Sequence, residues 1–376
     1  MAATTSVFEI MDEVSAGPGG AAGEFEQVVF CQHHASGLRA VIAIHSTVLG
    51  PALGGTRFWP YATEAEAVTD VCRLARGMTY KHAAAGLDQG GGKAVIWGDP
   101  RTQRSEALIR AYGRFVHGLD GRYLTAEDVG TTQADMDLIR RETPYVTGVS
   151  PSLGGSGDPS PATAWGVLWA IRAAASVRWG AEDLSGRHVV VSGVGKVGSA
   201  LVGHLLDDGA RVTVADVRDD AVRAVLDAHP DAAAGGRLSA VAPGEAHTVE
   251  ADVFAPCALG AVLDERTIPE LRCEVVAGSA NNQLATPEDD DRLAERDILY
   301  VPDYVANAGG VINIAEEPAG YDQARAWHRV AGIHDTVLAI LDRARQEGIT
   351  PGRAADRHAE ARIAAIGAVS LLRTSR

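Results

Sequence analysis

The stretch "VVVSGVGKVGSALVGHLL", residues 189–206, decides the fold. An apolar β-branched run leads into Gly193-x-Gly195-x-x-Gly198, and a helical pattern follows, which is the order of strand, glycine turn and helix. A second strand-like run, "RVTVAD", ends at Asp216, 18 residues after Gly198. This set predicts the first half of a Rossmann-type domain that binds a dinucleotide.

Each position of the glycine pattern has a physical role. Gly193 allows the tight turn, Gly195 lets the backbone approach a pyrophosphate, and Gly198 lets the helix lie close to the strand, while the helix N-terminus offers N–H groups to the anion. Asp216 is expected to accept hydrogen bonds from ribose hydroxyls and to repel a 2′-phosphate, which favours NAD over NADP. The alternative is a Rossmann-like domain that has lost its nucleotide.

The rest of the chain divides around this domain. From about residue 185, β-branched runs alternate with helical ones, which is typical of a doubly wound parallel sheet. Residues 150–163, "SPSLGGSGDPSPAT", have the composition of a linker or cleft loop. We therefore expect an α/β fold with a substrate-binding and catalytic domain at residues 1–148, a Rossmann-type NAD-binding domain at 149–350, and a C-terminal helical segment at 351–376 that packs toward the first domain.

Composition and charge exclude several classes of function. The 376 residues are 46% hydrophobic and carry a net charge of −15, which disfavours nucleic acid and anionic membrane surfaces as partners. The four scattered cysteines and the histidines form no zinc-binding pattern, so we expect no metal site. Without a signal peptide or an apolar run of membrane length, the sequence predicts a soluble cytoplasmic protein.

Residues 77–100, "GMTYKHAAAGLDQGGGKAVIWGDP", hold the second informative pattern. A helix opened by a Thr63 and Glu66 capping box is expected to carry Lys81 near its end, and Lys93 is expected to begin a strand. The glycines at 90–92 are predicted to form a loop that lets a substrate approach the backbone. A phosphate loop is excluded because Leu87 stands at its first glycine position and a strand follows Lys93.

Two ammonium groups in one dry site have different uses. Each disfavours the charge of the other, so one lysine is expected to have a lowered pKa and to act as a base, while the other binds a carboxylate. Glu127 and Asp128 follow the strand-like run "RYLTA" and could exchange protons at the strand end. A turn or cap role for Asp128 stays open at this point.

These motifs resemble the amino-acid dehydrogenases of the glutamate, leucine, phenylalanine and valine group, most closely the leucine and valine dehydrogenases. The resemblance runs from about residue 27 to the end and rests on "GPALGGTRFWPY", "RGMTYKHAAAGLDQGGGKAVIWGDP", "TAEDVGTTQADMD", "GGSGDPSPATAWGV", "SGVGKVG", "FAPCALGA", "AGSANNQLA" and "VPDYVANAGGVIN". It implies NAD-dependent, reversible oxidative deamination of an L-amino acid to the 2-oxo acid and ammonia, in a homo-oligomer. At His82 the chain departs from the leucine and valine enzymes, which usually have asparagine there.

The resemblance also implies residue roles. Lys93 would be the general base, Asp128 would hold the amino group and relay protons, and Lys81 would bind the substrate carboxylate. Further implied substrate contacts are Gly54, Gly55, Asn281 and Asn282, with a side-chain pocket of Leu53, Ala126, Val311 and Ile314. Implied cofactor contacts, besides the glycines and Asp216, are Thr163, Lys196, Val197, Cys257, Ala258 and Asn307.

The aliphatic pocket favours a branched-chain substrate: valine, leucine or isoleucine. Two alternatives stay open, namely the same reaction on an aromatic or unusual L-amino acid, and a non-catalytic NAD-binding sensor or partner subunit. Retention of both lysines and Asp128 argues against the second.

Overall fold

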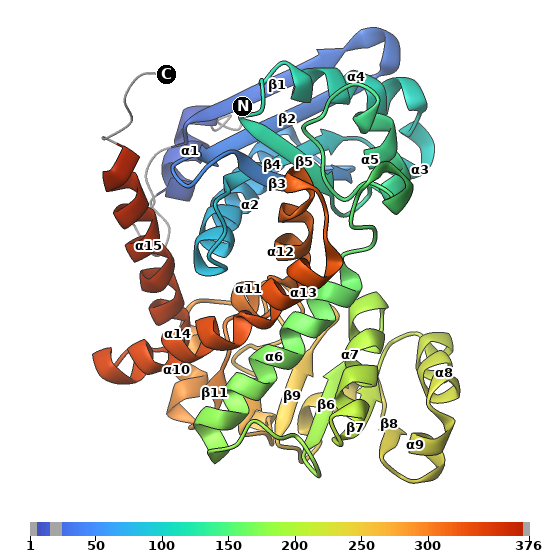
Figure 1. The fold of residues 1–376 in the computed structure, drawn as a ribbon, viewed down its shortest axis with the longest axis vertical. Coiled ribbons are helices and arrows are strands. Elements are labelled where there is room, and N and C mark those ends of the chain that lie inside the picture. The colour runs from blue at the N-terminus through green and yellow to red at the C-terminus, as the bar shows by residue number, and fades with distance from the viewer. Residues whose placement is uncertain (1–5, 16–24, 371–376) are drawn as a thin grey trace. The chain divides into compact units, whose positions relative to one another are not determined.

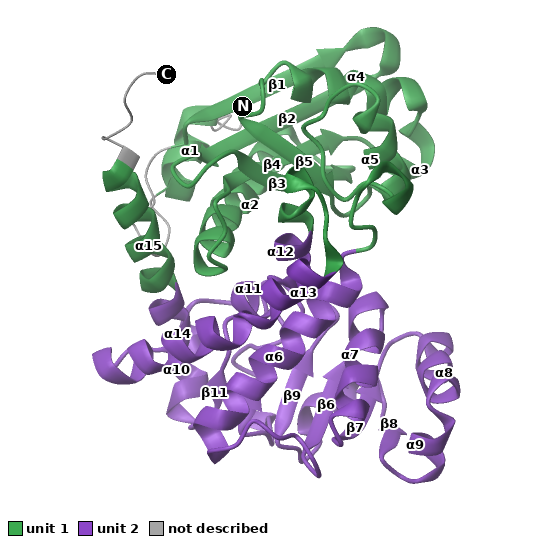
Figure 2. Ribbon diagram, viewed as in Figure 1, with its two compact units in different colours: residues 1–158, 314–323, 356–376 green, residues 159–313, 324–355 purple. Residues whose placement is uncertain are grey.

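The chain divides into two units (Figure 2), which the computed structural model describes over residues 6–15 and 25–370. Parts of the predicted first domain and C-terminal segment, residues 1–5, 16–24 and 371–376, lie outside the described residues. Unit 1 comprises the described residues of 1–158, 314–323 and 356–376; unit 2 comprises 159–313 and 324–355. The chain first passes from unit 1 to unit 2 after Asp158, within the Gly/Pro/Ser-rich stretch at residues 150–163.

Unit 1 is built on a sheet that has five strands among the described residues, in the order β1-β2-β4-β3-β5. The strands are β1 (Gln27–His33), β2 (Leu38–Ser46), β3 (Ala52–Trp59), β4 (Gly90–Trp97) and β5 (Tyr123–Glu127). Strands β1 and β2 form an antiparallel pair around a short turn, η1 (His34–Ser36). Strand β3 runs parallel to both β4 and β5, so their carboxyl ends share one edge of the sheet.

Helices cover both faces of this sheet (Figure 1). The helices of unit 1 are α1 (Val7–Ser15), α2 (Glu64–Ala84), α3 (Pro100–Gln103), α4 (Glu106–His117) and α5 (Gln133–Arg140), with η2 (Pro151–Leu153), η5 (Glu317–Ala319) and the later part of α15 (Pro351–Ser370). Val71 and Ala75 of α2 pack on Val41 and Val95 of the sheet, whereas α4 packs on the alternate strand positions of the other face. The sheet is therefore buried on both sides.

The C-terminal helix packs on the rest of unit 1, as predicted, and from Asp356 on it belongs to that unit. Arg362 of α15 donates to the Leu87 carbonyl over 2.6 Å and pairs with Asp88 over 2.7 Å, and Tyr80 of α2 donates to Glu360 over 3.1 Å. The start of α2 differs from the prediction in one detail. Thr63 caps the Glu66 N–H, but the Glu66 carboxylate accepts from the N–H of Ala62 instead of that of Thr63.

The predicted glycine loop at 90–92 is wrong: these residues begin strand β4. A Cβ on Gly91 would lie 2.0 Å from Thr79 Oγ1 and 2.2 Å from Thr79 N of α2, and one on Gly92 would lie 2.8 Å from the Tyr123 ring. The glycines therefore make room for neighbouring parts of the protein itself. They bring the helix that carries Lys81 close to the strand that carries Lys93.

We expect Gly91→Ala to destabilise unit 1 by about 3 kcal/mol or more, because the backbone of α2 would have to move to admit the methyl group. Gly77→Ala is the matched control. Gly77 lies midway along α2 on its solvent-exposed side, where a Cβ meets nothing within 4 Å. That change should stabilise by about 0.5–1 kcal/mol. Urea denaturation of both variants measures the difference, and equal midpoints would contradict the close-packing role of Gly91.

Unit 2 has a parallel sheet with six strands among its described residues, in the order β11-β10-β9-β6-β7-β8. The strands are β6 (His188–Ser192), β7 (Arg211–Ala215), β8 (Leu238–Ala240), β9 (Val253–Pro256), β10 (Val275–Val276) and β11 (Leu299–Tyr300). The chain order reverses direction at β6, the central strand beside β9, as expected for a doubly wound Rossmann-type sheet. The predicted fold class is confirmed.

Helices surround this second sheet (Figure 1). They are α6 (Ser160–Trp179), α7 (Lys196–Asp207), α8 (Asp219–Ala228), α9 (Pro230–Ala234), η3 (Pro243–Thr248), η4 (Ile268–Glu270), α10 (Glu288–Glu295), α11 (Asp303–Ala306), α12 (Gly309–Ala315), α13 (Gln323–Ala331) and α14 (Ile333–Glu347). Helix α6 packs along both α7 and α14. The glycine pattern thus lies between β6 and α7, at the carboxyl edge of the sheet.

Candidate active site

Lys93 and Asp128 form an ion pair in unit 1, beside the end of strand β5. Lys93 Nζ lies 3.0 Å from Asp128 Oδ2. Lys93 is buried within β4, and Asp128 directly follows β5, so rigid strands position both groups. A buried amine that contacts a carboxylate can pass protons to or from a bound molecule.

A second cation, Arg57 of β3, holds the same carboxylate oxygen. Arg57 Nε donates to Asp128 Oδ2 over 3.2 Å, and its Nη1 donates to Asp70 Oδ2 of α2 over 2.8 Å. The Tyr61 hydroxyl also donates to Asp70 Oδ2. A connected network therefore runs from α2 through β3 to the Lys93–Asp128 pair.

The network keeps Asp128 ionised. Burial alone would raise the pKa of Asp128, but the charges of Lys93 and Arg57, with hydrogen bonds from Lys93 and the Val129 backbone, outweigh burial and hold that pKa below its ordinary value. A carboxylate in this state accepts hydrogen bonds and attracts an ammonium group.

Gly55 makes the pairing possible. It lies between the two groups, because the register of β3 places it beside Lys93 of β4 and opposite Ala126 of β5. A Cβ on Gly55 would lie 2.8 Å from Asp128 Cβ and 2.6 Å from the Glu127 carbonyl. A side chain there would push Asp128 away from Lys93.

The other predicted residues of unit 1 divide between the two faces of the sheet. Leu53 and Ala126 share the face of Lys93 and are buried, as is Ile314 of α12. Gly54 belongs to the opposite face, where a Cβ would lie 1.8 Å from the Gly92 carbonyl and where the Gly54 carbonyl accepts from the Tyr123 hydroxyl over 2.7 Å. The geometry therefore favours Gly55, rather than Gly54, as a neighbour of the Lys93–Asp128 pair.

His82 links the helix that carries Lys81 to the strand that carries Lys93. Its ring is fully buried, and Nδ1–H donates to the Gly90 carbonyl at the start of β4 over 2.7 Å. Among the described residues, Nε2 has no hydrogen-bond partner. Burial, reinforced by the charges of Lys81 and Lys93 and opposed by the Gly90 bond, lowers the pKa of His82 to about 4. The ring is therefore neutral and adds no third charge beside the lysines.

This gives a prediction for acid stability. The unfolded chain protonates His82 near pH 6.5 and the folded chain near pH 4, so the stability that His82 contributes is present above pH 6.5 and is lost as the pH falls toward 4. We expect a loss of about 2.4 kcal/mol between pH 7 and pH 4.5. His82→Asn keeps a donor for the Gly90 carbonyl but does not titrate. The difference in unfolding free energy between wild type and this variant should therefore change by this amount between the two pH values. Urea unfolding at pH 7 and pH 4.5 measures it, and parallel losses in both proteins would contradict it.

The glycine pattern of unit 2 has the geometry of a dinucleotide turn. Gly193 has a positive φ of 105°, and a Cβ there would lie 2.6 Å from Ala258 Cβ. A Cβ on Gly198 would lie 1.9 Å from the Gly193 carbonyl, whereas one on Gly195 would meet nothing within 4 Å. Gly193 and Gly198 are therefore required by the turn itself. Gly195 leaves open space at the N-terminus of the 12-residue helix α7, which fits a pyrophosphate.

Asp216 lies directly after β7, as predicted, and braces this turn. Asp216 Oδ2 accepts from the Val194 N–H over 2.8 Å, and Oδ1 accepts from the Arg218 N–H over 2.9 Å. A carboxylate has about four acceptor sites, so two remain for ribose hydroxyls. The acid is thus fixed beside the turn.

The remaining predicted residues of unit 2 lie near the same sheet edge or on nearby helices. Cys257 and Ala258 follow β9 and contact Gly193, and burial raises the pKa of the Cys257 thiol. The buried Asn307 donates to Asn281 Oδ1 over 2.8 Å. The other positions are Thr163 in α6, Lys196 and Val197 in α7, Asn282 with a positive φ, and Val311 in α12.

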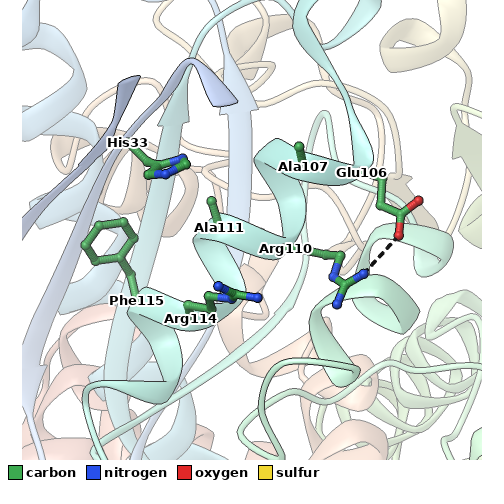
Figure 3. A pocket seen from close by; sticks show the side chains of 7 residues that line it. All are labelled: His33, Glu106, Ala107, Arg110, Ala111, Arg114 and Phe115. Atoms are coloured by element: carbon green, nitrogen blue, oxygen red, sulfur yellow. Dashed lines mark hydrogen bonds and ion pairs between the residues drawn. The ribbon is translucent and has the colours of Figure 1, made fainter. Parts of the chain in front are cut away.

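A separate hollow of about 690 Å³ lies against α4, on the opposite face of the unit 1 sheet from Lys93 (Figure 3). None of its lining residues was predicted to bind substrate or cofactor, and its Arg110 and Arg114 already pair with Glu142. Within residues 6–15 and 25–370, no group of three or more His, Cys, Asp or Glu side chains could hold a metal ion. No described helix is both long and apolar enough to cross a bilayer.

The network of Arg57, Asp70 and Tyr61 was not predicted from the sequence. One signal was available: strand alternation puts Arg57 on the same face as Gly55, and a charge at a sheet position that is otherwise small or apolar needs a partner. The identity of that partner depends on the strand order, which local patterns do not reveal.

The chain is similar to known proteins over most of its length. The family model described as "Glu/Leu/Phe/Val dehydrogenase, dimerisation domain" matches residues 25–145, and "Glutamate/Leucine/Phenylalanine/Valine dehydrogenase" matches residues 154–220 and 223–373. The chain is 57% identical over 343 residues to a valine dehydrogenase of Streptomyces virginiae, covering 91% of this chain and 94% of that protein. It is 50% identical over 363 residues to a leucine dehydrogenase of Bacillus cereus, covering 96% and 95%.

A solved structure shares the fold. The L-tryptophan dehydrogenase of Nostoc punctiforme matches with a TM-score of 0.80 and 41% identity, over 96% of this chain and 99% of that one. Both parts of the chain are thus matched by family models and by whole proteins of one group. The chain belongs to the glutamate/leucine/phenylalanine/valine dehydrogenase family.

Proposed function

We propose that this protein catalyses the reversible, NAD-dependent oxidative deamination of a branched-chain L-amino acid. An L-amino acid, water and NAD⁺ give the 2-oxo acid, ammonium, NADH and a proton. The observation that carries the proposal is the Lys93–Asp128 ion pair at 3.0 Å, in a chain 50–57% identical to leucine and valine dehydrogenases. Valine, leucine and isoleucine are the proposed substrates.

The residues of unit 1 would divide the chemistry. Lys81 would pair with the substrate carboxylate, and the anionic Asp128 would accept hydrogen bonds from the α-amino group. Lys93 would take a proton from the water that attacks the imino acid, and Asp128 would relay protons to and from the departing nitrogen. Lysine suits the base role because its amine can lose a proton, which a guanidinium does not do in proteins.

Membership of the family implies a nicotinamide cofactor, and we propose NAD. A bound nicotinamide would supply the acceptor for the hydride that leaves Cα of the substrate. The open backbone at Gly195 would receive the pyrophosphate, and Asp216 would bind ribose hydroxyls and repel a 2′-phosphate. Thr163, Lys196, Val197, Cys257, Ala258 and Asn307 stay proposed cofactor contacts.

The preference for a branched side chain rests on Leu53, Ala126, Val311 and Ile314, which are all aliphatic. Asn281 and Asn282 stay proposed substrate contacts. We also propose a homo-oligomer, because the matched N-terminal family model is described as a dimerisation domain. A cytoplasmic location stays part of the proposal.

The test is NADH formation, followed by absorbance, from a panel of L-amino acids. We expect valine, leucine and isoleucine to give higher kcat/KM than phenylalanine, tryptophan and glutamate, with D-valine inactive and NADP⁺ poorly used. Phenylalanine or tryptophan at the top would replace the substrate assignment with an aromatic one. NAD binding without turnover of any amino acid would favour a non-catalytic sensor.

A further inference from the structure

Arg57 is built into the Lys93–Asp128 pair more firmly than a surface ion pair would be. Its guanidinium and the Lys93 ammonium share one oxygen, Asp128 Oδ2, at 3.2 and 3.0 Å. Two cations on one oxygen repel each other, so an external anchor is needed to keep both there. Asp70 supplies it, accepting from Arg57 over 2.8 Å.

Asp70, which anchors Arg57, is itself held in place by its helix and by Tyr61. Asp70 belongs to the first half of α2, whose buried face packs on the sheet, and the Tyr61 hydroxyl donates to the carboxylate oxygen that Arg57 uses. Arg57, Asp70 and Asp128 have side chains that are 24, 29 and 21% exposed, so solvent screens their charges only in part. The guanidinium of Arg57 is thus fixed beside Lys93 and Asp128, and its charge acts on both with only partial screening.

The permanent charge of Arg57 changes the cost of removing a proton from Lys93. With Arg57 present, the trio of Arg57, Asp128 and Lys93 goes from a net charge of +1 to 0 when Lys93 Nζ gives up a proton. Without Arg57, the pair would go from 0 to −1 and leave a half-buried carboxylate uncompensated, which a low-dielectric site disfavours. Arginine suits this task because it keeps its charge at any working pH.

We propose that Arg57 is a positioning residue that holds Asp128 against Lys93 and, by its fixed charge, lets Lys93 release its proton without leaving Asp128 uncompensated. The inference rests on the proposed function, since it concerns the proton that Lys93 exchanges. Nothing in the proposed reaction requires Arg57 to touch the substrate.

Neighbouring elements also carry charged and titratable groups. Helix α2 contributes Asp70, which partly offsets Arg57, and Lys81, whose charge also reaches His82; His82 itself is neutral. Tyr61 keeps its proton, because burial and its bond to Asp70 raise its pKa. Arg104, which follows α3, pairs instead with Asp135 at 3.4 Å. Arg57 is therefore the cation whose removal most changes the charge balance of Lys93 and Asp128.

The sequence offers a direct readout, because Lys81, Lys93 and Lys196 are its only lysines. Protein labelled with [6-¹³C]lysine gives three side-chain signals, and Lys93→Arg assigns the one that matters. In Arg57→Gln we expect the Lys93 signal to titrate about one pH unit or more above wild type, because a positive charge has been removed. The acid limb of the kcat/KM profile should move in the same direction. Equal titration midpoints in wild type and Arg57→Gln would overturn the proposal.

Two further variants separate charge from positioning. Arg57→Lys keeps the charge but cannot bridge Asp70 and Asp128 with a planar fork, so kcat should fall at least tenfold with the midpoint within about half a unit of wild type. Should Arg57→Gln not fold, Asp70→Asn gives the opposite test: it removes the carboxylate that offsets Arg57, so the Lys93 signal should titrate at lower pH, and a rise would overturn the proposal. The titration needs no turnover, so an inactive wild type would refute only the proposed function.

Discussion

Lys93→Ala is expected to reduce amino-acid-dependent NADH formation by about 10²–10⁴-fold, the range that a positioned acid or base contributes. The affinity for NADH should stay within about twofold, because the dinucleotide turn belongs to unit 2 and Lys93 to unit 1. Steady-state kinetics and fluorescence titration with NADH measure the two effects. Arg57 remains to pair with Asp128, so the variant should keep a folded unit 1.

Lys93→Arg is the informative control for that result. It preserves a cation against Asp128 but cannot act as a base, because guanidinium does not lose its proton in proteins. It should be about as inactive as Lys93→Ala. Activity near the wild-type level in either variant would show that Lys93 is not the base, and activity in Lys93→Arg alone would reduce its role to a fixed charge.

Gly198→Ala is expected to abolish measurable NAD binding, because its Cβ would lie 1.9 Å from the Gly193 carbonyl and displace the turn. Gly195→Ala should distinguish an effect on ligand binding from an effect on folding. Its Cβ meets no protein atom within 4 Å, so the free energy of unfolding should be unchanged while NADH binds at least about tenfold more weakly. Isothermal titration calorimetry with NADH, with thermal unfolding alongside, measures both.

Gly203→Ala provides the matched control in the same helix. A Cβ there makes only an ordinary contact, 3.7 Å from the His229 ring, so NADH affinity should be unchanged and stability slightly higher. If Gly195→Ala binds NADH as tightly as Gly203→Ala does, the pyrophosphate does not lie at this turn.

The second unit was predictable because its information is local. The runs before and after Gly193 show a strand and a helix within twenty residues, and Asp216 follows the next strand at the expected spacing. Parallel order follows, since consecutive strands joined by helices pack in that way. The dinucleotide-binding turn also predicts that Gly195 makes room for the ligand and that Gly198 makes room for the packing of helix on strand.

The first unit was predicted less completely, because its decisive contacts are far apart in sequence. Glycine is a poor strand former, so residues 90–92 look like a loop until helix α2 is placed against them. Arg57 meets Asp128 from 71 residues away and Asp70 from 13, through a strand order that local patterns do not specify. The sequence did predict that Asp128 follows a strand and that Lys93 begins one, although β4 in fact begins at Gly90. The resemblance to the family implied the roles of the two residues.

The most direct test of the proposed reaction follows the hydride. Purified protein is incubated with L-[2-²H]valine and NAD⁺, and the nicotinamide, the oxo acid and ammonia are quantified by mass spectrometry and a chemical ammonia assay. We expect deuterated NADH, 3-methyl-2-oxobutanoate and ammonia in equal amounts, with deuterium at the nicotinamide C4. Reduced cofactor without deuterium, or oxo acid formed without ammonia, would contradict the proposed reaction.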